Sequence, residues 1–108
     1  MKITLRQLSY VIAASRHGSI SKAAEEMSIS TSSILAAIDA FEHEFKIQLF
    51  VRRRSKGLST TEAGRRAISR TIQLLDEAAA YAEELRGSDT ELRGELQVGA
   101  FTSISRRR

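Results

Sequence analysis

Three helical patterns follow one another within the first 45 residues, and the connections between them are very short. The first is expected to end at Gly18, because glycine readily adopts the left-handed conformation that closes a helix. The second is expected to start after Ser21 and the third at Ser30, which leaves little more than Ser28 and Ile29 between them. A connection this short forces a sharp corner between two helices, as a helix-turn-helix requires.

Caps and apolar positions support these three helices. Thr4 and Gln7 have the spacing of a capping box, the reciprocal pair of hydrogen bonds that closes a helix N-terminus. Ile29 and Ile34 occupy the positions of a hydrophobic staple around the start of the third helix. Each helix then offers one apolar face to a shared core. The apolar positions are Leu5, Leu8, Val11 and Ile12 in the first, Ala23, Ala24 and Met27 in the second, and Ile34, Ile38, Phe41 and Phe45 in the third.

β-prone residues replace the helical pattern after residue 47. Residues 48–53 and 57–60 form two short runs of this kind, and the polar tip Arg54-Ser55-Lys56 separates them. This spacing predicts a small hairpin, or wing, that carries a cluster of basic side chains.

A long amphipathic pattern covers residues 62–86. Thr61, or Ser59 with Glu62 as its partner, is the expected cap, and Gly87 is the expected end. The helix would be about 37 Å long. Its apolar stripe exceeds what a head of about 60 residues would cover, so we expect a partner helix to cover it. The alternative is that the helix packs wholly against its own domain. The expected dimerisation row is Ile68, Ile72, Leu75, Ala79 and Ala82, beside a second row of Ala67, Leu74, Ala78, Tyr81 and Leu85.

These patterns divide the chain into a winged helix-turn-helix head at 1–60, a linker and dimerisation helix at 61–86, and a C-terminal stretch at 87–108. Residues 87–94 have the composition of a polar linker, and 95–99 alternate like a strand. Since one strand is not stable alone, we expect 87–108 to contain the truncated start of a further domain. The fold class is therefore expected to be mainly α, with three helices, a two-stranded wing and a long C-terminal linker helix.

Positive charge is concentrated in one stretch of a chain whose formal net charge is +4. Residues 46–66 contain seven basic residues and one acid, whereas residues 17–45 contain one lysine and five acids. Clustered basic charge is typical of a nucleic-acid binder. Taken alone, the cluster fits a solvated basic loop equally well.

Composition excludes several classes of site. The chain has no cysteine, which excludes disulfides and thiolate metal sites. No apolar run approaches the roughly 20 residues of a membrane span, and the N-terminus lacks the apolar segment of a secretory signal. We therefore expect a cytoplasmic protein with no membrane partner.

Catalytic constellations are equally scarce. His17 and His43 fall on different predicted helices, and neither has the spacing of a metal-binding pair. Glu42 and Glu44 are two residues apart, so they point to different sides of a helix and form no acid–base pair. No glycine-rich phosphate loop follows a predicted strand. We expect no enzyme activity and no cofactor.

The start of the third helix has the properties of a DNA-contacting surface. Its side chains are small, and no acid occurs before Asp39. A helix N-terminus carries partial positive charge, and a helix-turn-helix inserts this end into the major groove. The residues expected at base edges are Thr31, Ser32, Ser33, Leu35 and Ala36. Those expected on phosphates are Ser21, Arg52, Arg53, Arg54 and Lys56. A structural alternative for Arg52 is an ion pair with Glu42 or another nearby acid.

Five short motifs carry a family resemblance. They are Leu-Arg-Gln-Leu at 5–8, Gly-Ser-Ile-Ser-Lys-Ala-Ala-Glu at 18–25, Ile-Asp-Ala-Phe-Glu at 38–42, Leu-Phe-Val-Arg at 49–52 and Thr-Glu-Ala-Gly at 61–64. Their letters, order and spacing closely resemble the N-terminal domain of LysR-type transcriptional regulators over about residues 3–86. Residues 93–99 resemble the start of that family's effector domain.

The resemblance implies a winged helix-turn-helix that dimerises through its linker helix, alone or within a higher oligomer. It also implies binding to double-stranded operators with dyad symmetry. Effector domains of the family bind small-molecule inducers, so a chain without that domain is expected to bind none.

The recognition helix departs from the family pattern. Where the family usually has Gln-Pro, and then Ser and a basic residue, this chain has Thr31-Ser32 and Leu35-Ala36. The bidentate donors that read guanine or adenine edges are therefore missing. We expect binding to depend heavily on phosphate contacts and the wing, with weaker base discrimination.

Two other functions fit parts of the sequence. The altered recognition helix favours a protein-interaction module, which would pair through the linker helix and touch DNA only non-specifically. RNA binding is disfavoured because exposed aromatics for base stacking are scarce, with Phe41, Phe45 and Phe50 at core-facing positions.

Overall fold

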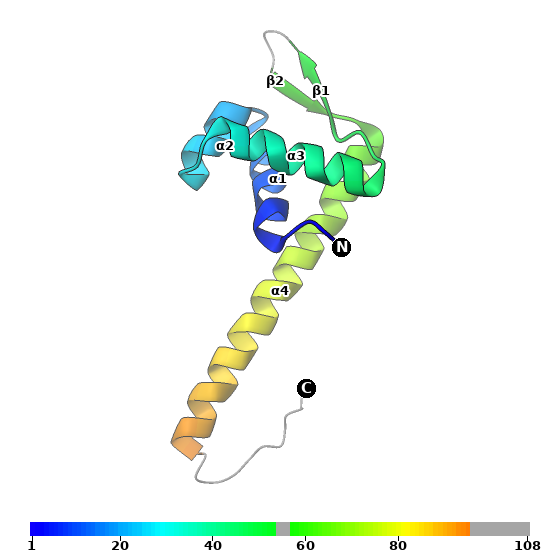
Figure 1. Ribbon diagram of the computed structural model, residues 1–108. Coiled ribbons are helices and arrows are strands. Elements are labelled where there is room, and N and C mark those ends of the chain that lie inside the picture. Colours follow the sequence, from blue (N-terminus) through cyan, green and yellow to red (C-terminus); the bar gives the residue numbers. More distant parts are fainter. Residues whose placement is uncertain (54–56, 96–108) are drawn as a thin grey trace. The chain divides into compact units, whose positions relative to one another are not determined.

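The chain divides into two compact units, Met1–Leu75 and Asp76–Arg108. The computed structural model describes the backbone of residues 1–53 and 57–95, and the side chains of 1–53 and 57–87 (Figure 1). Unit 1 holds α1 (Leu5–His17), α2 (Ile20–Met27), α3 (Thr31–Phe45), β1 (Phe50–Arg53), β2 (Gly57–Thr60) and the first part of α4 (Glu62–Glu95). In unit 2 the described residues are the remainder of α4. Within the described ranges, no helix combines the length and apolarity that crossing a bilayer requires.

Both ends of α1 lie where the sequence predicts them. The Thr4 side chain accepts a hydrogen bond from the Gln7 backbone N–H at 3.0 Å, and the Gln7 side chain accepts one from the Thr4 N–H at 3.0 Å. Gly18 closes the helix in the left-handed region, with φ of 62°. The predicted capping box and glycine stop are both confirmed.

The helix-turn-helix corner lies between α2 and α3. The predicted start of α2 after Ser21 is wrong, because Ser19 is the cap and accepts from the Lys22 N–H at 3.2 Å. Ser19 has the extended backbone that a cap needs, directly after the left-handed Gly18. Ser28 turns the chain with φ of 58°, and Ser30 caps α3 as predicted.

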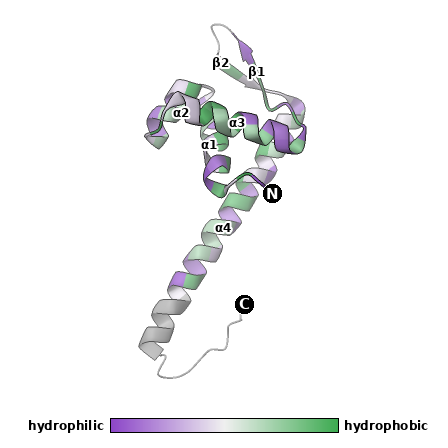
Figure 2. Ribbon diagram, in the orientation of Figure 1, coloured by the Kyte–Doolittle hydropathy of each residue, from purple (hydrophilic) through white to green (hydrophobic). Residues whose placement is uncertain are grey.

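The core of unit 1 lies where α1, α2 and α3 pack against one another. Figure 2 shows hydrophobic positions along α1 and α3, the two helices that supply most of it. The fully or nearly fully buried side chains include Val11, Ala13, Ala23, Ile34, Ala37 and Leu49. Phe41 and Phe50 are buried as predicted, but Phe45 is 39% exposed. Phe45 is the last residue of α3, where its ring packs edge-on against Phe41 with centroids 4.8 Å apart.

The wing is an antiparallel pair in which Phe50 faces Thr60 and Arg53 faces Gly57. It begins at Phe50, two residues later than predicted, because the preceding backbone is already bonded elsewhere. The Leu49 N–H donates to the Glu42 carboxylate at 2.6 Å, and the Leu49 carbonyl accepts from the Thr61 N–H at 2.9 Å. The Gln48 carbonyl accepts from the Thr61 hydroxyl.

Helix α4 starts where predicted and ends later. The Thr61 hydroxyl accepts from the Gly64 N–H at 2.8 Å, which makes Thr61 the cap. The predicted end at Gly87 is wrong, since the helix continues to Glu95. An interior glycine costs a helix only about 1 kcal/mol, which does not end a helix rich in Glu and Arg. Most of the predicted linker is thus helical, and the rest of the strand-like stretch, 96–99, lies outside the described residues.

Candidate nucleic-acid interface

One groove of unit 1 brings together the start of α2, the start of α3 and the wing. Its lining residues are Ser19, Ile20, Ser21, Thr31, Arg52, Arg53, Gly57 and Leu58. Three segments that the sequence assigned separately to DNA contact therefore share one surface. Ser21, Thr31, Arg52 and Arg53 are all exposed on it.

Two helix N-termini contribute positive potential to this surface. Both α2 and α3 have a serine cap and no acid in the first turn. The unpaired N–H groups of a first turn carry partial positive charge, which suits a phosphate. The groove therefore combines these two N-termini with the exposed charges of Arg52 and Arg53.

The serine side chains at the start of α3 form a small hydrogen-bonded cluster. The Ser30 hydroxyl accepts from the Ser33 N–H at 3.2 Å and lies 2.9 Å from the Ser32 hydroxyl and 3.1 Å from that of Ser33. Ser33 is half-buried, whereas Ser32 is exposed. Among the other predicted base-edge residues, Thr31 and Ala36 are exposed and Leu35 is half-buried.

The wing arginines Arg52 and Arg53 are exposed to solvent. The alternative in which Arg52 pairs with Glu42 is wrong, because the described residues contain no ion pair between them. Among the described residues, neither Arg52 nor Arg53 makes an ion pair. The predicted phosphate contacts Arg54 and Lys56 lie outside the described residues.

A backbone contact fixes the wing against the corner between α1 and α2. The Leu58 N–H donates to the Gly18 carbonyl at 3.0 Å. Gly57 has φ of 72°, and a side chain there would overlap the Gly18 carbonyl oxygen. Sequence reasoning missed this contact, because Gly18 was predicted only as the end of a helix and Gly57 only as part of a β-prone run.

An ionic cluster joins the end of α1 to the end of α2. One Arg16 nitrogen lies 2.9 Å from both oxygens of Glu26, and the His17 Nε2 lies 2.8 Å from one of them. The hydrogen bond from Arg16, followed by that with His17, holds the pKa of the Glu26 carboxyl below its ordinary value of 4.5. The cluster ties α2, and with it the helix-turn-helix, to α1.

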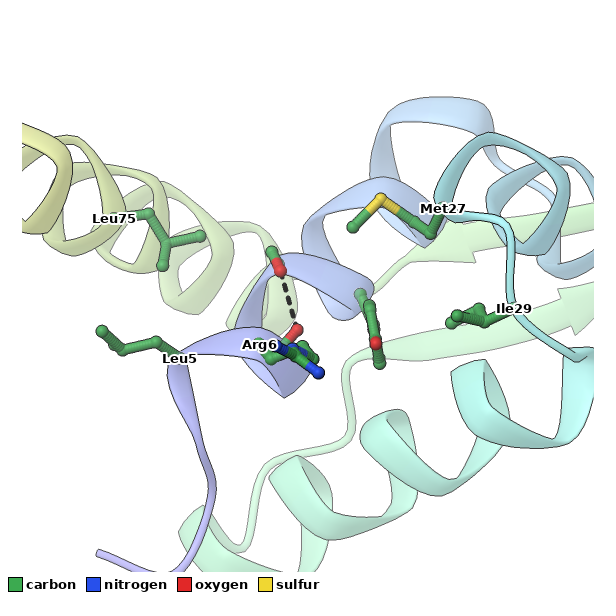
Figure 3. Close-up of a pocket in the computed structure, with 7 residues that line it drawn as sticks. Leu5, Arg6, Met27, Ile29 and Leu75 are labelled. Carbon is green, nitrogen blue, oxygen red and sulfur yellow. Dashed lines mark hydrogen bonds between the residues drawn. The ribbon is translucent and has the colours of Figure 1, made fainter.

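The predicted dimerisation row separates into buried and exposed members. Ile68 is only 7% exposed and belongs to the core of unit 1, so its side chain is already covered. Leu75 is half-buried and lines a second, largely apolar groove of unit 1 together with Leu5, Arg6, Ser9, Tyr10, Met27 and Ile29 (Figure 3). Ile72 and Ala79 are exposed, and Ala82 is half-buried. The most exposed large apolar side chains of α4 belong mainly to the other row: Leu74, Tyr81 and Leu85.

The described part of the chain holds no group of three or more His, Cys, Asp or Glu side chains that would suit a metal ion.

The model of the bacterial regulatory helix-turn-helix proteins of the LysR family matches residues 5–65. The chain belongs to the LysR family. It is 34% identical over 108 residues to the RuBisCO operon transcriptional regulator of Allochromatium vinosum, covering 97% of this chain and 34% of that protein. It is 32% identical over 99 residues to the transcriptional regulator BudR of Klebsiella aerogenes, covering 92% and 68%. The chain spans about a third of the length of the first curated relatives that it matches.

Solved LysR-family structures confirm the expected fold class. The DNA-binding domain of CbnR in complex with DNA has a TM-score of 0.74 at 25% identity, covering 81% of this chain and 99% of that one. The DNA-binding domain of BenM in complex with catB site 1 DNA has a TM-score of 0.76 at 27% identity, covering 82% and 95%.

One of the motifs that resembled the LysR family now has a structural explanation. Thr61 caps α4 and also donates to the Gln48 carbonyl, so it joins the helix to the segment that precedes β1. Any side chain at Gly64 would overlap the backbone of Leu49. The Thr61–Gly64 motif therefore sets how closely α4 approaches the base of the wing.

Proposed function

We propose that this chain is the sequence-specific DNA-binding part of a transcriptional regulator, and that it binds double-stranded operators as a homodimer. The observation that carries the proposal is the groove that unites the start of α3, the start of α2 and the two wing arginines. The relatives are named as transcriptional regulators, and two similar solved domains are complexes with DNA.

In the proposed complex the start of α3 enters the major groove, with Thr31, Ser32 and Ala36 toward the base edges. Ser33 contributes mainly to the serine cluster, because its side chain is half-buried. Ser21, Arg52 and Arg53 contact phosphates, with Arg54 and Lys56 as further cations of the same hairpin. Such contacts fix register and supply salt-dependent affinity.

Dimerisation is proposed to use the exposed apolar residues of α4. Leu74, Tyr81 and Leu85 belong to one row of α4 and are between 42% and 64% exposed, and exposed large apolar side chains at helical spacing favour a partner. Ile68 is removed from the proposed interface because it is buried. A two-fold dimer presents two copies of α3, and the operator would therefore have dyad symmetry.

The function has no catalytic step, and the protein would act in the cytoplasm, where its DNA lies.

Selection of bound fragments from the source genome, followed by a salt titration, tests the proposal. Arg53→Ala should weaken binding to the selected operator and reduce the slope of log K against log salt by about one unit per lost phosphate contact. Arg70→Ala removes an equal charge from outside the groove and should leave the slope nearly unchanged.

Binding that is independent of sequence and disappears at moderate salt would favour the protein-interaction module instead. Unchanged affinity and slope in Arg53→Ala would contradict the role given to the wing.

A further inference from the structure

The composition of α3 limits how it can read DNA. Across Thr31–Phe45 there is no Arg, Lys, Asn or Gln. These are the side chains that make bidentate hydrogen bonds to guanine or adenine in the major groove. If the groove binds DNA as proposed, α3 must obtain its sequence information in another way.

Hydrogen bonding by the serines of α3 is also restricted. The hydroxyls of Ser32 and Ser33 both lie within hydrogen-bonding distance of the Ser30 hydroxyl, which itself caps the helix. Ser33 is half-buried in addition. The hydroxyl of Thr31 is the freest donor in the first turn, since the described contacts give it no partner.

Besides these hydroxyls, Thr31, Leu35 and Ala36 carry methyl groups at this end of α3. Thr31 and Leu35 are one helical turn apart, and Ala36, the next residue along the chain, is exposed. Leu35 is half-buried, yet it belongs neither to the apolar core of unit 1 nor to the side chains packed against that core. Asp39, an exposed acid, bounds this surface one turn later.

We infer that Leu35, with the methyl groups of Thr31 and Ala36, selects operators by contact with thymine C5-methyl groups. The inference rests on the proposed function and names the base feature that it uses. In the major groove a thymine presents a methyl group that the unmodified G·C pair lacks, so apolar contact there distinguishes the pairs without a bidentate donor. Arg53 and the helix N-termini supply affinity on the phosphates, which is the same for every sequence.

Replacement of thymine by deoxyuridine tests the inference, because it removes only the methyl group and keeps the pairing and the phosphates. We expect one thymine in each half-site at which deoxyuridine lowers affinity about fourfold, the transfer value of one buried methyl group. With both half-sites changed, the loss should be about fifteenfold for a dimer if the half-sites act additively.

A double-mutant cycle links this loss to the side chain. Leu35→Ala should bind the thymine operator more weakly, show no further loss with deoxyuridine at the contacted position, and keep the wild-type salt slope. Arg53→Ala should lose affinity equally for both duplexes and reduce the slope. Leu5→Ala is the matched control, because Leu5 is 48% exposed and lies outside the groove of the candidate interface. It should leave both affinities unchanged. Thermal unfolding of each variant checks that it is folded.

Equal affinity for thymine and deoxyuridine operators at every position, in a protein that still prefers its selected sequence, would overturn the inference and leave the proposed function intact. No preference for the selected sequence over a scrambled duplex would overturn the proposed function, and the inference with it.

Discussion

Gly57 shows how one residue controls the position of the wing. It holds a left-handed backbone, with φ of 72°, directly against the Gly18 carbonyl, and the next N–H donates to that same oxygen. A side chain at Gly57 would force these two backbone segments apart. The residue therefore affects both the stability of unit 1 and the placement of Arg52 and Arg53.

Gly57→Ala should lower the free energy of unfolding by about 1–3 kcal/mol, from backbone strain and the lost wing contact. DNA affinity should fall as well. Urea unfolding and an operator titration measure the two effects. Gly87→Ala is the control, since a side chain there meets nothing within 4 Å, and it should be neutral or stabilise α4 by up to about 1 kcal/mol. A Gly57→Ala protein as stable as the wild type would contradict the close contact between the wing and the Gly18 carbonyl.

Glu26→Gln should change how stability depends on pH. Arg16 and His17 depress the pKa of Glu26 in the folded chain, so its contribution is present above the ordinary value of 4.5 and is lost as pH falls through the lower folded pKa. The variant should therefore melt at a lower temperature than the wild type near neutral pH. The two melting temperatures should converge in acid.

Thermal melts across the acid range follow this difference. Glu25→Gln removes the same charge one residue away, leaves the cluster intact, and should have little effect. Because the Glu26 side chain is 40% exposed, the effect should also shrink as salt is added.

At the scale of elements, two of the locally determined helix caps were predictable, the local cap of α2 at Ser19 was missed, and the boundary set by a long-range bond was not predictable. Thr4 and Ser30 cap their helices through residues three positions away, so the sequence alone identified them. The start of β1 depends on a bond between Glu42 and Leu49, and no local pattern reports such a bond. The end of α4 depends on whether a helix passes through Gly87, and a stop signal read in isolation could not decide that.

The same distinction holds for the candidate site. The sequence pointed to Thr31, Arg52 and Arg53 from charge and helix position, and the structure brings them to one groove. It did not identify the contact between Gly18 and Leu58 that holds the wing in place. It also placed Ile68 on the dimer surface, because periodicity shows which residues share a stripe but not which part of the stripe its own head covers.

Glu42→Ala should lower the free energy of unfolding by removing a hydrogen bond between α3 and the start of the wing. Its half-buried carboxylate accepts from the N–H of the fully buried Leu49, and removal leaves that donor unsatisfied. An unsatisfied buried donor costs about 1–3 kcal/mol, measurable by urea unfolding. Glu42→Gln keeps an accepting oxygen and should recover part of the loss, whereas Glu44→Ala should have a small effect. Equal stability of the Glu42 and Glu44 alanine variants would argue against this role.

At the scale of the whole molecule, the exposed apolar residues of α4 predict self-association. Tyr81→Glu should raise the dimer dissociation constant at least tenfold, because the new carboxylate would be desolvated in the interface. Gln73→Glu introduces the same charge at an exposed polar position and should change the constant little. Sedimentation equilibrium measures both. A Tyr81→Glu protein that dimerises like the wild type would show that the interface lies elsewhere.

The hydrogen bond from Leu58 to the Gly18 carbonyl involves only main-chain atoms. Backbone atoms therefore set the position of the hairpin against the corner between α1 and α2, and of the hairpin residues at this contact only Gly57 must lack a side chain. Substitution of the exposed Arg52 and Arg53 would change the charge of the hairpin and leave this backbone contact in place. In the proposed function, affinity for phosphates and preference for a base sequence can therefore change independently during evolution.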